Sequence, residues 1–138
     1  MARSEPVVVT WKQQGLLFEG VTPNGRVDLA SALDERGRGA SPMELLALAL
    51  AGCTAMDVVT ILRKMREPVE GLSVEVSGEK ADDHPRRYLS LKIVYRLKGD
   101  LDERKVGRAI QLSEDKYCSV EATLRPGVHI SSQVVIER

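Results

Sequence analysis

The stretch "SPMELLALALAGCTAMDVVTILRKMR", residues 41–66, decides the fold because it predicts one long apolar helix in an otherwise charge-rich chain. Ser41 suits the N-cap, Pro42 suits the first helical position, and the Glu44 carboxylate can return to the Ser41 backbone N–H as a capping box. The closing "LRKMR" places cations at the negative end of the helix dipole, and Pro68 disfavours helical geometry just beyond it. We therefore expect a helix from Pro42 to about the end of the quoted stretch.

The first half of this helix is apolar on every side between Leu45 and Met56, so neither of its faces can be left in water. A helix of this length spans roughly 37 Å, about the width of a small domain. One sheet can cover only one side of it. In a chain of 138 residues, the simplest cover for the other side is a second copy of the same helix across a two-fold axis. We therefore expect a homodimer.

The rest of the chain has the pattern of short strands and one further helix. Apolar and polar residues alternate in several short segments, and "PNG" and other turn residues separate them. The predicted strands are residues 7–12, 16–21, 26–30, 71–80, 86–97 and 128–136, and the second helix is residues 101–117. The first three strands should form an antiparallel meander and the next two a hairpin. Because the sequence lacks the βαβ alternation of parallel sheets, we predict an α+β fold in a single domain, residues 1–138.

Composition narrows the possible partners. Twenty Lys and Arg residues balance twenty Asp and Glu residues, which removes the broad attraction that nucleic acid or an anionic membrane surface requires. No segment approaches the roughly 18 apolar residues of a membrane span, and the N-terminus lacks a secretory pattern. Only two cysteines are present, which excludes a disulfide framework. We expect a cytoplasmic protein that binds neither nucleic acid nor membrane.

Cys53 has two interpretations. A free cysteine often packs as a small hydrophobic residue in a core. However, Asp57 and Thr60 follow it by four and seven positions, so Cys53 lies on a helix stripe that becomes polar and can face a cleft. A neighbouring carboxylate disfavours the thiolate, and the middle of a helix gives little help from the dipole. An activating cation would have to come from elsewhere in the fold.

Cys118 precedes "SVEATLRPG", where Ser119 can cap a short helical turn. A cysteine beside a helix N-terminus is well placed to ionise, although a packed residue at a helix junction would have the same pattern. The two cysteines lie 65 positions apart, and neither is close in sequence to one of the two histidines. This spacing does not predict a metal site, and no glycine-rich phosphate loop is present. We expect no metal and no organic cofactor.

Two stretches, "SPMELLALALAGCTAMDVV" and "EDKYCSV", resemble the OsmC/Ohr family of osmotically induced and organic hydroperoxide resistance proteins. The order of elements is similar to that family over nearly the whole chain. The resemblance implies an intertwined homodimer in which antiparallel sheets surround long central helices. It also implies that Cys53 attacks a hydroperoxide, that Cys118 resolves the sulfenic acid as a disulfide, and that an external dithiol reductant restores both thiols.

The chain departs from the peroxidase branches of this family at the residues that activate the thiol. Those branches carry a Glu ten positions before the first cysteine, where this chain has Met43, and an Arg in the early strands, where this chain has "KQQG". The candidate activating residues are therefore Arg26, Arg38 and Glu44. This pattern leaves two hypotheses: a cysteine-dependent hydroperoxide reductase with weak activity, or a non-catalytic OsmC-fold dimer that binds a small apolar ligand or senses oxidants through the same two cysteines.

Overall fold

The computed structural model describes residues 1–33 and 37–138. Contacts between residues divide the chain into two compact units, Met1–Leu46 and Ala47–Arg138. A single domain over the whole chain therefore stays a prediction.

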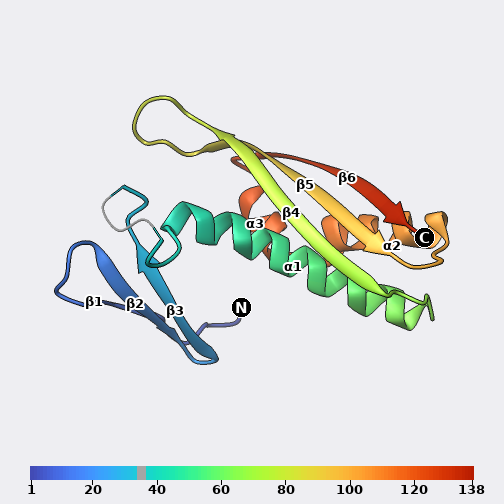
Figure 1. Ribbon diagram of the computed structural model, residues 1–138, viewed down its shortest axis with the longest axis horizontal. Helices are drawn as coiled ribbons and strands as arrows, with labels where there is room; N and C mark the ends of the chain where they lie inside the picture. The colour runs from blue at the N-terminus through green and yellow to red at the C-terminus, as the bar shows by residue number, and fades with distance from the viewer. Residues whose placement is uncertain (34–36) are drawn as a thin grey trace. The chain divides into compact units, whose positions relative to one another are not determined.

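The first unit contains a three-stranded antiparallel sheet in the order β1-β2-β3 (Figure 1). The strands are β1 (Val8–Trp11), β2 (Leu17–Thr22) and β3 (Gly25–Ala30). The Thr22 hydroxyl accepts hydrogen bonds from the backbone N–H groups of the next turn, which closes the β2–β3 hairpin. The predicted meander is confirmed.

Helix α1 (Pro42–Lys64) begins in the first unit and continues through the second. The Ser41 N–H donates to Glu44 Oε1 at 2.8 Å, and the Glu44 N–H donates to Ser41 Oγ at 3.2 Å. These two bonds form the predicted capping box. The helix ends two residues before the predicted end, and Arg66, with φ at 59°, then turns the chain out of the helical conformation.

The length and composition of α1 also correct one prediction. This helix is long and apolar enough to cross a membrane, whereas the sequence pattern predicted no segment of that kind. The small and polar residues within α1 interrupt its apolar residues without making the helix polar. Length and composition do not distinguish a membrane span from the core helix of a water-soluble protein.

The second unit contains the sheet β4-β5-β6, with the strands β4 (Gly71–Lys80), β5 (Tyr88–Lys98) and β6 (His129–Glu137). Strands β4 and β5 form the predicted antiparallel hairpin, but β6 pairs with β5 in parallel. The sheet is therefore mixed, and the chain contains one parallel crossover that the sequence pattern did not indicate. Alternating side chains fix which face of a strand is buried but not the direction of the strand. The α+β class is confirmed.

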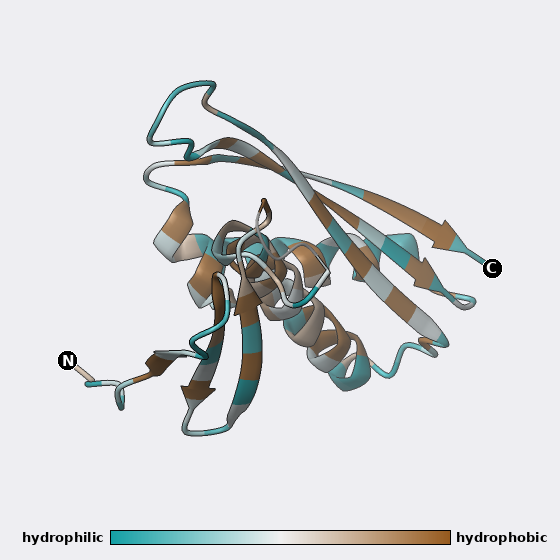
Figure 2. Ribbon diagram, turned by 60° about the vertical axis from the view of Figure 1, so that its left-hand side comes forward, coloured by the Kyte–Doolittle hydropathy of each residue, from teal (hydrophilic) through white to brown (hydrophobic). Residues whose placement is uncertain are grey.

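The crossover from β5 to β6 is helical. It consists of α2 (Glu103–Leu112), a π-helical turn η1 (Ser113–Tyr117) and α3 (Ser119–Leu124), where the sequence predicted one continuous helix over 101–117. Together with the second-unit part of α1, these helices lie on one side of the sheet, as both views show (Figures 1 and 2). Hydrophobic and hydrophilic segments alternate along β4 and β5 (Figure 2), as a sheet covered on one face requires. The fully buried side chains of this unit include Leu50, Val58, Leu62, Leu91, Ile93, Tyr95, Leu97 and Val106.

Candidate functional site

The second unit brings the two cysteines together. Cys53 and Asp57 lie on successive turns of α1, and Cys118 immediately precedes α3. The two sulfur atoms and a carboxylate oxygen of Asp57 all lie within 4.8 Å of one another. Cys53 is half-buried, Cys118 is buried, and both are free thiols. The juxtaposition agrees with the pairing that the family resemblance implied, although the roles of the two thiols stay predictions.

Cys118 is itself the N-cap of α3. Its Sγ accepts a hydrogen bond from the Glu121 backbone N–H at 3.3 Å, so the prediction that Ser119 caps this helix is wrong. Burial, followed by the hydrogen bond with Cys53, raises the pKa of the Cys118 thiol to about 12. The expectation that the helix N-terminus favours ionisation is therefore overridden by burial. Burial therefore favours the neutral form of the Cys118 thiol.

The Asp57 carboxylate is held in place from the crossover segment. The Ser113 hydroxyl donates a hydrogen bond to Asp57 Oδ2 at 3.0 Å, and Ser113 is fully buried at the first position of η1. A π-helical turn places its side chains differently from a regular helix and is frequent at functional sites. Ser113 was missed in the sequence because nothing in the local pattern links it to a residue 56 positions earlier.

Two carboxyl groups follow in the same segment, of which Glu121 is buried and Glu114 is half-buried. Glu121 is only 3% exposed, its Oε1 lies 3.4 Å from an Arg125 nitrogen, and its Oε2 has no hydrogen-bond partner within the described chain. Burial and then the charge of Glu114 raise its pKa above the usual range. Burial also raises the pKa of Glu114, which accepts a hydrogen bond from the Tyr95 hydroxyl at 3.3 Å. The surroundings of Cys118 therefore disfavour negative charge.

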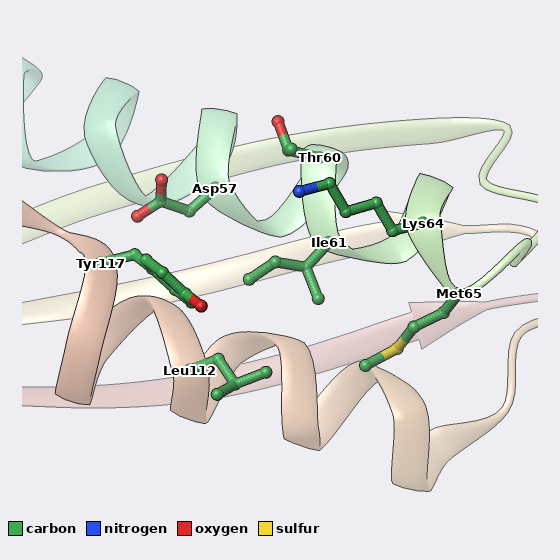
Figure 3. Close-up of a pocket in the computed structure, with 7 residues that line it drawn as sticks. All are labelled: Asp57, Thr60, Ile61, Lys64, Met65, Leu112 and Tyr117. Atoms are coloured by element: carbon green, nitrogen blue, oxygen red, sulfur yellow. The ribbon is translucent and has the colours of Figure 1, made fainter.

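A pocket of about 370 Å³ adjoins this site and shares Asp57 with it. Its lining comes from α1 on one side and from the end of α2 and η1 on the other (Figure 3). The residues are Asp57, Thr60, Ile61, Lys64, Met65, Leu112 and Tyr117. Most of the lining is apolar, and Lys64 and Asp57 add one charge of each sign. The position of Lys64 in the last turn of α1 predicted only a helix-terminal charge, and its place in the pocket was not predicted.

The candidate activating residues all belong to the first unit. Arg26 forms an ion pair with Glu19 across strands β2 and β3, with the nitrogen 3.0 Å from the carboxylate oxygen. The Glu44 carboxylate completes the capping box with Ser41. Arg38 lies in the segment before α1. An activating role for Arg26, Arg38 or Glu44 stays a prediction.

Comparison with known proteins identifies the family. The family model described as OsmC-like protein matches residues 34–133. The chain is 36% identical over 124 residues to protein YhfA of Escherichia coli K12, which covers 89% of this chain and 91% of YhfA. A solved structure of a protein from Aquifex aeolicus is 30% identical, with a TM-score of 0.83 and complete coverage of both chains. An organic hydroperoxide resistance protein from Elizabethkingia anophelis shares the fold at 10% identity, with a TM-score of 0.75 and 99% coverage of each chain. The chain therefore belongs to the OsmC-like protein family.

Proposed function

We propose that this protein reduces organic hydroperoxides, with Cys53 as the attacking thiol and Cys118 as the resolving thiol. The observation that carries the proposal is the position of the two sulfur atoms, within 4.8 Å of each other and next to a largely apolar pocket. The shared fold with an organic hydroperoxide resistance protein supports it.

The reaction balances with these two thiols and one external reductant. The Cys53 thiolate attacks the hydroxyl-bearing peroxide oxygen and the O–O bond breaks, so that Cys53 becomes a sulfenic acid and the departing alkoxide takes a proton from water to leave as the alcohol. The Cys118 sulfur then attacks the sulfenic sulfur, a disulfide forms, and the sulfenic hydroxyl leaves as water with the proton that Cys118 loses. The Asp57 carboxylate, within 4.8 Å of both sulfur atoms, is the candidate relay for this proton. An external dithiol, of the kind that reducing cytoplasm supplies, returns both residues to thiols by disulfide exchange.

The pocket favours an apolar substituent on the peroxide. Ile61 of α1 and Met65, just beyond the end of α1, face Leu112 and Tyr117 across it (Figure 3). Asp57 belongs both to the pocket lining and to the cluster with the two thiols. A hydroperoxide with an aromatic or alkyl group can bury that group here, and burial of apolar area is favourable. Hydrogen peroxide has no such group and should be the poorer substrate.

We further propose that the active form is a homodimer. Leu48 and Met56 on α1 are 63% and 73% exposed in the single chain, although they lie in its most apolar half. A second copy of the same helix would remove both side chains from water. Light scattering at micromolar concentration should give twice the mass of one chain, and a folded monomer would overturn this proposal.

Turnover should be slow. The Asp57 carboxylate next to Cys53 opposes thiolate formation, and Met43 stands where the peroxidase branches carry a Glu. General acid–base and electrostatic assistance of the kind that such a Glu can supply is worth roughly a hundredfold or more in rate.

The test is steady-state consumption of cumene hydroperoxide with a dithiol reductant. Wild-type protein should turn over slowly, Cys53→Ser should abolish the reaction, and Cys118→Ser should react once and leave a sulfenic acid that dimedone traps. Because the chain has only two cysteines, the double variant is a thiol-free control. Activity that persists in Cys53→Ser would refute the proposal. Absence of turnover in a wild-type protein whose pocket still binds an apolar probe would favour the non-catalytic ligand-binding alternative.

A further inference from the structure

We propose that the reduced cluster of Cys53, Asp57 and Cys118 is a binding site for a soft divalent metal ion of the zinc class, and that formation of the disulfide abolishes it. The proposal depends on the arrangement of the three donors and not on catalytic turnover. It therefore stands or falls independently of the proposed hydroperoxide reduction.

The donor set suits zinc. Two thiolates and one carboxylate oxygen are ordinary zinc ligands, with zinc–sulfur distances of about 2.3 Å. Two sulfurs on one tetrahedral ion are therefore separated by about 3.8 Å. The three donor atoms here already lie within 4.8 Å of one another. Side-chain rotations that move the donor atoms by about 1 Å therefore bring them onto one ion. Hard cations such as Mg²⁺ prefer oxygen donors and are not expected to bind.

The surroundings support a metal ligand at Asp57. The buried Ser113 hydroxyl donates to Asp57 Oδ2, which leaves the other carboxylate oxygen for an ion. Hydrogen bonds from residues that do not themselves bind the metal commonly orient the side chains that do. Asp57 also lines the pocket, so that a fourth position on the ion could be reached by water or by an external ligand. Three protein ligands with one open position is the arrangement of zinc sites that keep an exchangeable ligand.

Metal binding and disulfide formation compete for the same two sulfur atoms. A divalent ion takes the place of the protons on both thiols, as metal binding to cysteine generally does. Oxidation to the disulfide removes both thiolates and leaves Asp57 as the one remaining donor of the cluster.

Cobalt(II) is the probe for the first test, because its thiolate complexes give a charge-transfer band in the near ultraviolet and tetrahedral sites give visible bands. Phosphine-reduced, chelator-treated protein is titrated with Co²⁺ and then with Zn²⁺. Both bands should appear at one ion per chain, and Zn²⁺ should remove them. Protein oxidised with diamide, which forms disulfides without a peroxide, should give neither band.

Four variants and a control locate the site. Cys53→Ser, Cys118→Ser and Asp57→Asn should each lower the affinity for Co²⁺ and Zn²⁺ at least tenfold. Ser113→Ala, which removes the bond that orients Asp57, should lower it by about tenfold. Asp83→Asn, which removes an exposed carboxylate from the β4–β5 loop, should leave it unchanged. Circular dichroism spectra that match wild type show that each variant is folded, and Asp57→Asn leaves both thiols in place if a cysteine variant fails to fold.

A Co²⁺ titration of the reduced wild-type protein without a charge-transfer band would overturn the proposal, as would equal binding by the oxidised protein. Wild-type affinity in Asp57→Asn would overturn the assignment of the carboxylate as a ligand.

Discussion

Replacement of Asp57 by Asn should make Cys53 more reactive. The carboxylate oxygen lies within 4.8 Å of the Cys53 sulfur, and two unit charges at that distance repel by about 0.9 kcal/mol at the dielectric constant of water and about 3.5 kcal/mol at a dielectric constant of 20. Cys53 is half-buried, so the smaller value is a lower limit. Removal of the carboxylate charge, which repels negative charge on the reacting sulfur, should therefore speed the reaction of Cys53 at least about fourfold. The Asn carbonyl can still accept the hydrogen bond from Ser113.

The assay is the rate of alkylation by iodoacetamide at pH 7 in a Cys118→Ser background, where Cys53 is the one thiol that can react. A chelator keeps the site free of metal. Asp57→Asn should raise the rate at least about fourfold, and the control Asp83→Asn should leave it unchanged. An unchanged or slower rate in Asp57→Asn would refute the argument, because it would mean that the carboxylate assists the thiol instead of repelling its charge.

Three further predictions concern stability and assembly. Burial raises the pKa of Glu121, so the stabilising contribution of this residue is complete below its unfolded-state pKa and is lost as pH rises through its folded-state pKa. In urea denaturation, Glu121→Gln should therefore gain stability relative to wild type between pH 4 and pH 8. A difference in unfolding free energy between the two proteins that stays constant with pH would contradict this. Ser41→Ala should lower the free energy of unfolding by about 1 kcal/mol through loss of the capping box, whereas Ser119→Ala should change it little because Cys118 caps that helix. Met56→Glu should shift the light-scattering mass from two chains toward one, since a charge would be buried in the proposed dimer interface.

Local chemistry accounts for the parts of the fold that could be predicted. The start of α1 depends on Ser41 and Glu44, which lie three positions apart and form both bonds of the cap between themselves. The N-cap of α3 was mispredicted. Ser119 is the better hydrogen-bond acceptor by residue type, but the chain is extended at Cys118 and already helical at Ser119. The direction of β6 depends on the path of the crossover and leaves no trace in its alternating pattern.

The candidate site was only partly predictable. The i,i+4 spacing placed Asp57 beside Cys53, because helix geometry alone brings such pairs together. The spacing of the cysteines gave no indication that Cys118 joins them, and that pairing came from the family resemblance. Ser113 and the pocket face of Lys64 depend on how the crossover packs on α1, and a sequence pattern does not encode that packing.

The most direct test of the central claim is a single-turnover reaction. Reduced, metal-free protein receives one equivalent of cumene hydroperoxide, the alcohol product is quantified, and the protein is digested and mapped without reduction. One cumyl alcohol per chain, together with a disulfide between Cys53 and Cys118 of the same chain, is the predicted result. A stable sulfenic acid at Cys53 with a free thiol at Cys118, or unconsumed peroxide with both thiols intact, would contradict the account.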